Sequence, residues 1–206
     1  MRRIPVFMLA LSVVLTAVSA AGEEAAQLFR VQRLSDRVLV FTETSPWESN
    51  HVVIVGADGL VLVDPGHTVL MGRLIRKAVA EELGRDRFAY VIDTHGHWGH
   101  TWGNGAFPEA TVVGHERAAE TMRADAGNLE RQAELLRRQV ELIEARLAEL
   151  DPAGEEAASA RLERDHFERA VRGLEETGFE VRLPGLTFSD RLHLDLGDLT
   201  LDIRFL

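Results

Sequence analysis

Apolar residues divide the first half of the chain into short strands separated by polar turns. Residues 28–42 alternate apolar and polar side chains on either side of a polar turn, which predicts a β-hairpin. Apolar runs at 50–55 and 60–63 flank the Ala-Asp-Gly turn at 57–59, which is typical of a second hairpin. The run at 60–63 is continuously apolar, as in a strand that is covered on both faces. Further strands are expected at 88–92 and 111–113.

One helix is predicted among these strands. Residues 70–83 carry apolar side chains at helical spacing, and Gly84 follows as a suitable C-cap. The order strand, helix, strand predicts an α/β fold in which the sheet is buried under helices.

Residues 115–178 have a different pattern, and we interpret them as a helical insertion. A heptad seam of apolar residues is followed by a break at 151–154 and a second helical stretch that ends at Gly178. This predicts an αα-hairpin inserted into the α/β domain. It has two alternative roles, as a solvated arm or as a surface for self-association or partner binding. The seam consists of Leu136, Val140, Ile143, Leu147 and Leu150 on the first helix, and of Ala158, Leu162, Ala170, Val171 and Leu174 on the second.

The last segment, 181–206, returns to strand patterning. Leu192, Leu194 and Leu196 alternate with polar residues, and a second alternating run follows a turn at 197–198. The sequence stops at Leu206 directly after an apolar strand. We therefore expect a C-terminally incomplete domain that can self-associate through an exposed sheet face or through the helical hairpin.

The first 21 residues predict a secretory signal peptide. Arg2 and Arg3 precede an apolar run at 4–18 and small residues at 19–21. A membrane anchor is the alternative, but the run is shorter than the roughly 20 residues that a span needs. Cleavage after Ala21 would leave a periplasmic or secreted domain, 22–206, without a membrane segment.

Composition narrows the class of protein further. The chain has 206 residues, of which 46% are hydrophobic and 27% are charged, and these are globular values. Lys and Arg total 23 against 33 Asp and Glu, a net charge of −10, so a nucleic-acid partner is not expected. The absence of cysteine excludes disulfides and thiolate metal ligands.

The candidate chemistry lies in a histidine-rich segment after the strand at 88–92. His95, His97 and His100 fall within six residues, and neutral imidazoles at a strand end suit zinc. Of the other histidines, His51 and His67 lie beside strand ends and can line a site, whereas His166 and His193 are expected at the surface.

The segment THGHWGH at 94–100 resembles the T-H-x-H-x-D-H signature of the metallo-β-lactamase superfamily. The resemblance covers most of residues 30–115 and 181–206 and leaves the helical insertion outside. It implies an αββα sandwich, with its first half present here. Matching segments include Asn50–Val55, Val63-Asp64-Pro65-Gly66, Thr101–Phe107, Val113–Glu116 and Leu183–Leu201.

The resemblance also implies roles for individual residues. His95 and His97 would be ligands of a first zinc ion and His100 of a second, and a zinc-bound hydroxide would attack a carbonyl or ester of a small molecule. Asp64 would orient a metal-binding histidine. Other residues that can line a pocket are His115, which we expect rather to hydrogen-bond a loop, and Trp98 and Trp102, for which core packing is an equal alternative.

Two departures from the family pattern affect the predicted activity. Gly99 replaces the motif aspartate, and the sequence stops before the family's later ligands, so no catalytic residue is certain and zinc binding is expected to be weak or absent. A complete domain would hold one or two zinc ions. The leading hypothesis is a zinc-dependent hydrolase of lactams, thioesters, sulfate esters or lactones. The alternative is a degenerate, non-catalytic relative that binds a partner through its helical arm.

Overall fold

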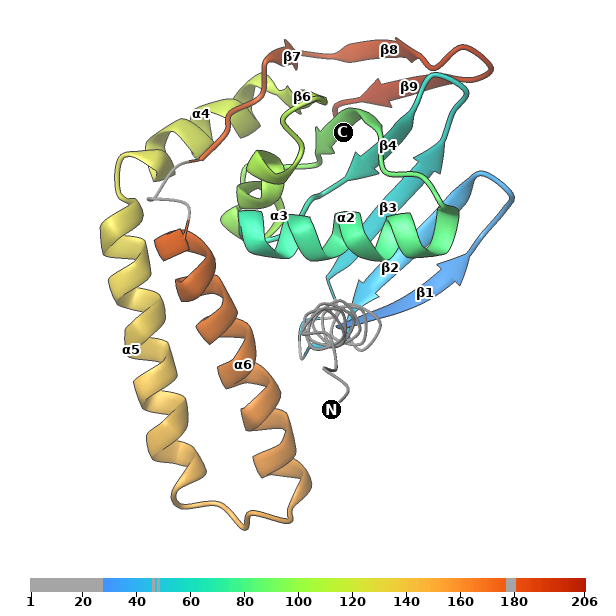
Figure 1. Cartoon of the computed structure of the whole chain (residues 1–206). Helices are drawn as coiled ribbons and strands as arrows, with labels where there is room; N and C mark the ends of the chain where they lie inside the picture. Colours follow the sequence, from blue (N-terminus) through green and yellow to red (C-terminus); the bar gives the residue numbers. More distant parts are fainter. Residues whose placement is uncertain (1–27, 46, 48, 177–180) are drawn as a thin grey trace, which may run out of the picture.

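A computed structural model describes residues 28–45, 47, 49–176 and 181–206. The predicted signal peptide at 1–21 therefore lies outside the described residues. Most of the strands belong to one seven-stranded sheet in which spatial order follows sequence order (Figure 1). Its strands are β1 (Phe29–Arg33), β2 (Val38–Glu43), β3 (Asn50–Val55), β4 (Leu60–Val63), β5 (Phe88–Asp93), β6 (Thr111–His115) and β7 (Leu186–Phe188).

The sheet is antiparallel in its first part and parallel in its second. The strands β1 to β4 form an antiparallel meander, and the predicted hairpins at 28–42 and 50–63 are both present. From β4 to β7 each neighbouring pair is parallel. Parallel neighbours require crossover connections, and helices supply most of them.

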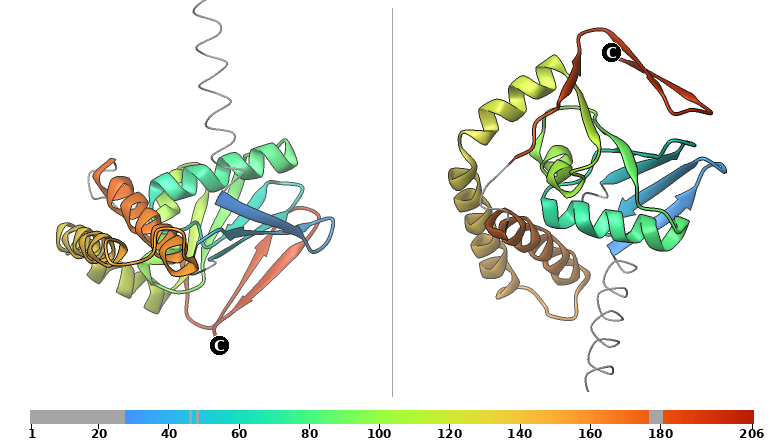
Figure 2. Two further views of the ribbon diagram at one scale, coloured as in Figure 1. Left: turned by 90° about the horizontal axis from the view of Figure 1, so that it is seen from below. Right: turned by 45° about the horizontal axis from the view of Figure 1, so that its top comes forward.

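Helix α2 (Val69–Leu83) covers one face of the sheet and β8 and β9 cover the other (Figure 2). The helix begins where the Thr68 hydroxyl accepts a hydrogen bond from the Met71 backbone N–H, and it ends at Gly84, whose φ is 63°. The hairpin of β8 (Arg191–Asp195) and β9 (Thr200–Arg204) buries Leu194 and Leu196 against the central strands. This hairpin reduces the exposed sheet face that we expected from the sequence.

The helical insertion contains three helices, one more than predicted. Helix α4 (Glu116–Ala126) follows β6 directly, and α5 (Leu129–Leu147) and α6 (Glu155–Glu176) form the predicted αα-hairpin, which we call the arm. Figure 1 shows the arm extending from one side of the sheet. None of the helices in the described ranges is both long and apolar enough to cross a membrane.

The predicted seam holds for α5 and is partly wrong for α6. Leu136 and Ile143 are buried as expected, but Leu162 is 44% exposed and Ala158 is also exposed. The reason is that α6 packs against the body of the protein as well as against α5. A side chain at Gly173, for example, would collide with Thr68. The buried residues of α6 are Ala157, Ala160, His166, Ala170, Gly173 and Leu174.

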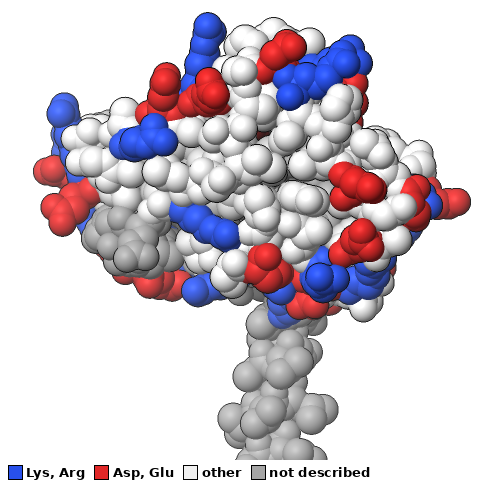
Figure 3. All heavy atoms as spheres, turned by 90° about the horizontal axis from the view of Figure 1, so that it is seen from above, with Lys and Arg blue, Asp and Glu red and all other residues white. Residues whose placement is uncertain are grey.

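The parallel strands place several polar residues at one edge of the sheet. Asp64 follows β4, His95 follows β5 shortly after its end, and His115 ends β6. Ligands of open α/β sheets bind outside the carboxyl ends of parallel strands. The face seen in Figure 3 carries acidic and basic side chains interspersed, so its charge is not gathered into a single patch.

We predict that Gly103→Ala destabilises the fold. The short 3₁₀ helix η1 (Trp102–Ala106) lies against the turn after β4, where the Gly103 N–H donates to the Gly66 carbonyl over 2.9 Å. A Cβ at position 103 would overlap the Pro65 carbonyl oxygen, and such overpacking typically costs about 1–3 kcal/mol. Urea unfolding measures the loss. Gly185→Ala is the control, because apart from residue 185 itself and its two chain neighbours no atom lies within 4 Å of the added Cβ, and equal effects of the two substitutions would contradict the prediction.

Candidate metal centre

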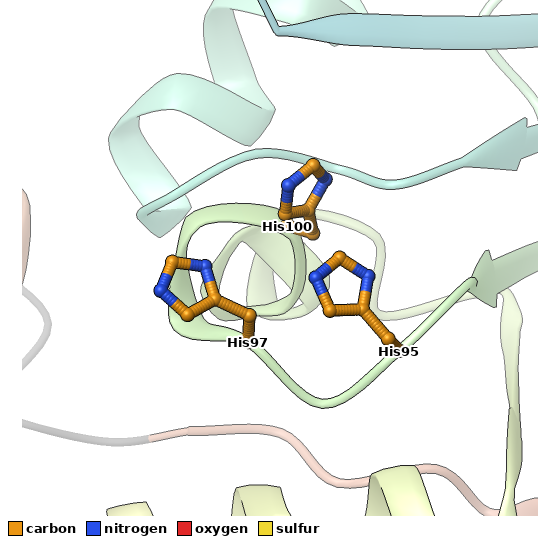
Figure 4. Close-up of side chains that lie close together, drawn as sticks. All are labelled: His95, His97 and His100. Atoms are coloured by element: carbon orange, nitrogen blue, oxygen red, sulfur yellow. The ribbon is translucent and has the colours of Figure 1, made fainter. Parts of the chain in front are cut away.

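Three histidine rings gather on the loop and short helix that follow β5 (Figure 4). The chain turns after Asp93, and His97 begins helix α3 (Trp98–Thr101) as its N-cap. One ring nitrogen from each of His95, His97 and His100 lies within 4.8 Å of the other two. The structure thus brings together the three residues that the sequence motif singled out.

The carboxylate of Asp64 organises this loop from the end of the neighbouring strand. Asp64 is buried and has a left-handed backbone with a φ of 57°, which Asp tolerates better than most residues. Its Oδ1 accepts from the Thr94 N–H over 2.9 Å, and its Oδ2 accepts from the Thr94 hydroxyl over 2.7 Å. The same Oδ2 lies 3.1 Å from Nδ1 of His100. Both oxygens are therefore engaged in orienting neighbouring groups.

These contacts determine which nitrogen each ring presents. The Thr94 hydroxyl proton is donated to Asp64, so Nδ1 of His95, 3.0 Å from that hydroxyl, must donate and Nε2 keeps its lone pair. His100 likewise donates from Nδ1 to Asp64 and presents Nε2. His97 differs, because its Nδ1 accepts from the Gly99 N–H over 3.3 Å and so carries the lone pair.

The electrostatic surroundings favour neutral imidazole at His97. Burial, followed by the nearby His100 and His95, lowers the pKa of His97 below its usual value of 6.5. Metal ions bind imidazole in its deprotonated form, so this shift favours a ligand role. The donor set fits a divalent ion such as zinc: His95 and His100 offer free Nε2 lone pairs, and His97 offers Nδ1 once an ion replaces its 3.3 Å contact with the Gly99 N–H.

A pocket borders the histidines on the side of the arm. It is lined by His97, Gly99 and His100 from the loop, and by aromatic side chains from the body and from α6. Trp98, for which pocket lining and core packing were equal alternatives, lies on the pocket wall and also packs against the apolar cluster that contains Trp102. The remaining lining residues are Trp47, Ser49, His166 and Phe167.

Trp102 and His115, the other two candidate pocket residues, both lie outside the pocket that borders His97 and His100. Trp102 is buried in the apolar core between the arm and the body, so core packing describes it. His115 hydrogen-bonds loops, as expected: Nδ1 accepts from the Arg117 N–H that opens α4, and Nε2 lies 3.0 Å from the Ser189 carbonyl. It also borders a second pocket beside His95, but both of its ring nitrogens are engaged.

The expectation that His166 lies at the surface is wrong. His166 is only 7% exposed, because α6 turns this side chain inward toward β2. Its Nδ1 lies 3.2 Å from the Glu43 carboxylate, and the ring of the buried His67 lies tilted against its ring with centroids 4.4 Å apart. His193 is exposed, as expected.

Glu43 is the residue of this buried group that sequence reasoning missed. Burial alone would raise the pKa of its carboxyl, but the hydrogen bond to His166 and the charges around it lower the pKa to about 2. One of those charges is the Arg169 guanidinium, 3.6 Å away. Burial lowers the pKa of His67 to about 3, so this ring stays neutral. The sequence signal that could have identified Glu43 is its position as an acidic residue at the end of an apolar strand.

Comparisons with known proteins agree with the fold. The sequence model of the metallo-beta-lactamase superfamily matches residues 44–201. A metallo-beta-lactamase from Pontibacter korlensis superposes with a TM-score of 0.51 at 15% identity, over 86% of this chain and 60% of its own. The present chain thus spans less than two thirds of that protein's length. A search among curated proteins gave no match.

Two further metallo-beta-lactamases are similar over a smaller part. The one from Erythrobacter litoralis, with beta mercaptoethanol in its active site, has 20% identity and a TM-score of 0.40, over 45% of this chain and 44% of its own. The one from Hirschia baltica has 19% identity and a TM-score of 0.40, over 47% and 48%.

We predict that His95 and His100 adopt the Nδ1–H tautomer in the metal-free protein, and His97 the Nε2–H tautomer. Nitrogen-detected NMR at about pH 8, where most imidazoles are neutral, distinguishes the two forms. In Asp64→Asn the single amide oxygen cannot accept from the Thr94 N–H, the Thr94 hydroxyl and the His100 ring together. We therefore expect the His100 ring to change tautomer or orientation. Nε2–H signals for His95 and His100 in the parent protein would contradict the assignment.

We also predict that acidification destabilises the metal-free protein through His51. Burial lowers the pKa of His51 below 6.5, although Nδ1 bonds the Asp64 carbonyl over 2.6 Å. Below pH 6.5 the unfolded chain binds a proton here that the folded chain does not. The free energy of unfolding therefore decreases as the pH is lowered below 6.5, by at most about 1.4 kcal/mol per pH unit for this group.

Urea unfolding at several pH values with a chelator present measures this slope. His51→Gln keeps an amide donor near Asp64 but removes the titration, so we expect a shallower slope. His193→Gln reports the effect of losing an exposed histidine. An unchanged slope in His51→Gln would show that another group is responsible.

Proposed function

Because this chain belongs to the metallo-beta-lactamase superfamily, we propose that it is a metal-dependent hydrolase whose ion is held by His95, His97 and His100. The observation that carries the proposal is the convergence of three ring nitrogens within 4.8 Å at the carboxyl end of β5. Zinc is the ion that this ligand set suits best. When bound, zinc polarises a carbonyl group and lowers the pKa of a bound water to about 7.

The chain's own residues have distinct tasks in this proposal. Asp64 contacts His100 directly and His95 through the Thr94 hydroxyl, so it would hold both rings with Nε2 available to an ion. The engaged carboxylate oxygens of Asp64 make it a positioning residue rather than a ligand. His97 presents Nδ1 at the start of α3, next to the pocket.

The pocket supports a small-molecule substrate with an apolar portion. Trp47, Trp98 and Phe167 form aromatic walls, while His97 and His100 lie at the polar end. A carbonyl or ester placed at that end would have its apolar side chain against the rings. The substrate classes that remain open are lactams, thioesters and other esters, because the fold does not decide among them.

Export to the periplasm or outside the cell is part of the same proposal. It rests on the basic start, the apolar run and the small residues within 1–21. Fractionation of cells that express the full sequence, with mass determination of the mature N-terminus, tests it. An unprocessed protein in the cytoplasm would refute it.

We predict that His97→Ala lowers zinc affinity and abolishes zinc-dependent hydrolysis. Removing one of three ligands should weaken binding by at least about 100-fold, and dialysis followed by elemental analysis measures the zinc retained. Hydrolysis of a chromogenic lactam and of a thioester is assayed with zinc and with a chelator. Zinc bound without any turnover in the parent protein would refute the hydrolase proposal and leave metal binding intact.

We predict that Gly99→Asp raises hydrolysis at least about tenfold, roughly 1.4 kcal/mol of the barrier. A Cβ at position 99 meets only the His97 ring, at 3.2 and 3.3 Å, so the carboxylate can be added beside the ligands with a small ring shift. It would add a negatively charged ligand and a group that orients water. Gly99→Asn is the control of equal size. A parent protein that is active and faster than Gly99→Asp would identify a working one-metal site.

A further inference from the structure

A second group of side chains of the types that bind metal ions lies beside the same pocket, which one of them, His166, lines. Glu43 ends β2, His67 follows the turn after β4, and His166 lies within α6. One ligand atom from each lies within 4.8 Å of the other two. The three residues are 1%, 2% and 7% exposed, so the group is far more buried than the histidines of the loop.

Two atoms of this group are buried without a hydrogen-bond partner. Within the described part of the chain, Oε2 of Glu43 and Nε2 of His67 have no partner. Burying an ionised carboxylate oxygen or an imidazole nitrogen in this way is costly, and nearly all such atoms in folded proteins are paired. A bound cation would satisfy both atoms at once.

We propose that Glu43, His67 and His166 form a second site, for a divalent transition-metal ion, distinct from the site of His95, His97 and His100. Two imidazoles and one carboxylate form a ligand set used for zinc and for ferrous iron, with further positions open to other ligands. His166 borders the pocket that also reaches His97 and His100, so the ion has a route to the site from solvent. The site does not depend on hydrolysis at the loop histidines.

The three ligands come from three separate parts of the fold. β2 belongs to the antiparallel half of the sheet, His67 belongs to the turn that also carries Asp64, and α6 belongs to the arm. An ion bound here would therefore fix the arm to the body beside the pocket. Such an ion stabilises the folded state, because the unfolded chain does not hold the three ligands together.

Arg169 competes with a metal ion for Glu43. Its guanidinium lies 3.6 Å from Oε1 of Glu43, on the same carboxylate oxygen that His166 contacts. Oε2 remains for the ion, and His166 must exchange its contact with Glu43 for the ion or present its other nitrogen. The positive charge of Arg169 opposes a second cation, so its removal should strengthen metal binding. A purely structural ion-pair network predicts instead that removal only destabilises the fold.

The test uses the full chain with the first site removed by His95→Ala, His97→Ala and His100→Ala together. We expect this triple variant to retain one Zn²⁺ per chain, measured by titration against a chromogenic chelator. In that background Glu43→Gln, which keeps the size but removes the charge, should lower affinity at least about 100-fold. Arg169→Gln should raise it about tenfold, and the exposed His193→Ala should leave it unchanged.

X-ray absorption on the zinc-loaded triple variant counts its ligands, and we expect two imidazoles. Absence of bound zinc in a folded triple variant would overturn the proposal, as would affinity that is insensitive to Glu43→Gln. If the triple variant does not fold, the zinc content of Glu43→Gln alone decides. A loss of one ion relative to the parent supports the site, and unchanged content refutes it. Activity is not the readout, so failure here leaves the hydrolase proposal standing.

Discussion

The buried carboxylate of Asp64 is the constraint on which the arrangement of the site depends. A buried charge must be paired or hydrogen-bonded, and the donors that meet this need come from one segment, Thr94 to His100. That segment reaches Asp64 because β4 and β5 are parallel neighbours whose ends are paired, with Val63 opposite Ile92. The backbone carbonyl of Asp64 also forms a hydrogen bond with the His51 ring from β3, so three successive strands are joined at this point.

The arm makes the second contribution to the site. Without α6 the histidine loop would lie on an open sheet edge, and His166 and Phe167 provide the wall that turns this edge into a pocket. The ion pair between Arg169 and Glu43 fastens α6 to β2, and the apolar cluster of Trp102, Leu136 and Leu174 fastens both arm helices to the body. The insertion is therefore part of the pocket rather than an appendage of the fold.

The sequence predicted what depends on local pattern. The structure confirms the strands of period two, the helix before Gly84 and the hairpin of α5 and α6. These elements were predictable because each depends on residues that are close together in the chain. The family assignment from the THGHWGH segment is also confirmed. His95, His97 and His100 were singled out because they share one loop, and the structure places their rings together.

Residues whose surroundings come from distant segments were not predictable in this way. His166 lies on a charged helix and is not part of the apolar seam predicted for it. It is buried because α6 packs against the body as well as against α5. The sequence allowed Trp102 to line the pocket or to pack in the core, and the packing of the arm against the body places it in the core. Glu43 could be recognised as a site residue only from its neighbours in the fold. These are His67, 24 positions later in the sequence, and His166, 123 positions later.

Charge balance links the two groups of histidines across the pocket. The loop histidines have no carboxylate among them, because position 99 is glycine, and Asp64 contacts them through ring N–H groups and the Thr94 hydroxyl. The second group has Glu43 but shares it with Arg169. A divalent ion on either group would keep most of its positive charge. Under the two proposals above, a ligand that is anionic, or that becomes anionic during reaction, would supply the remaining negative charge.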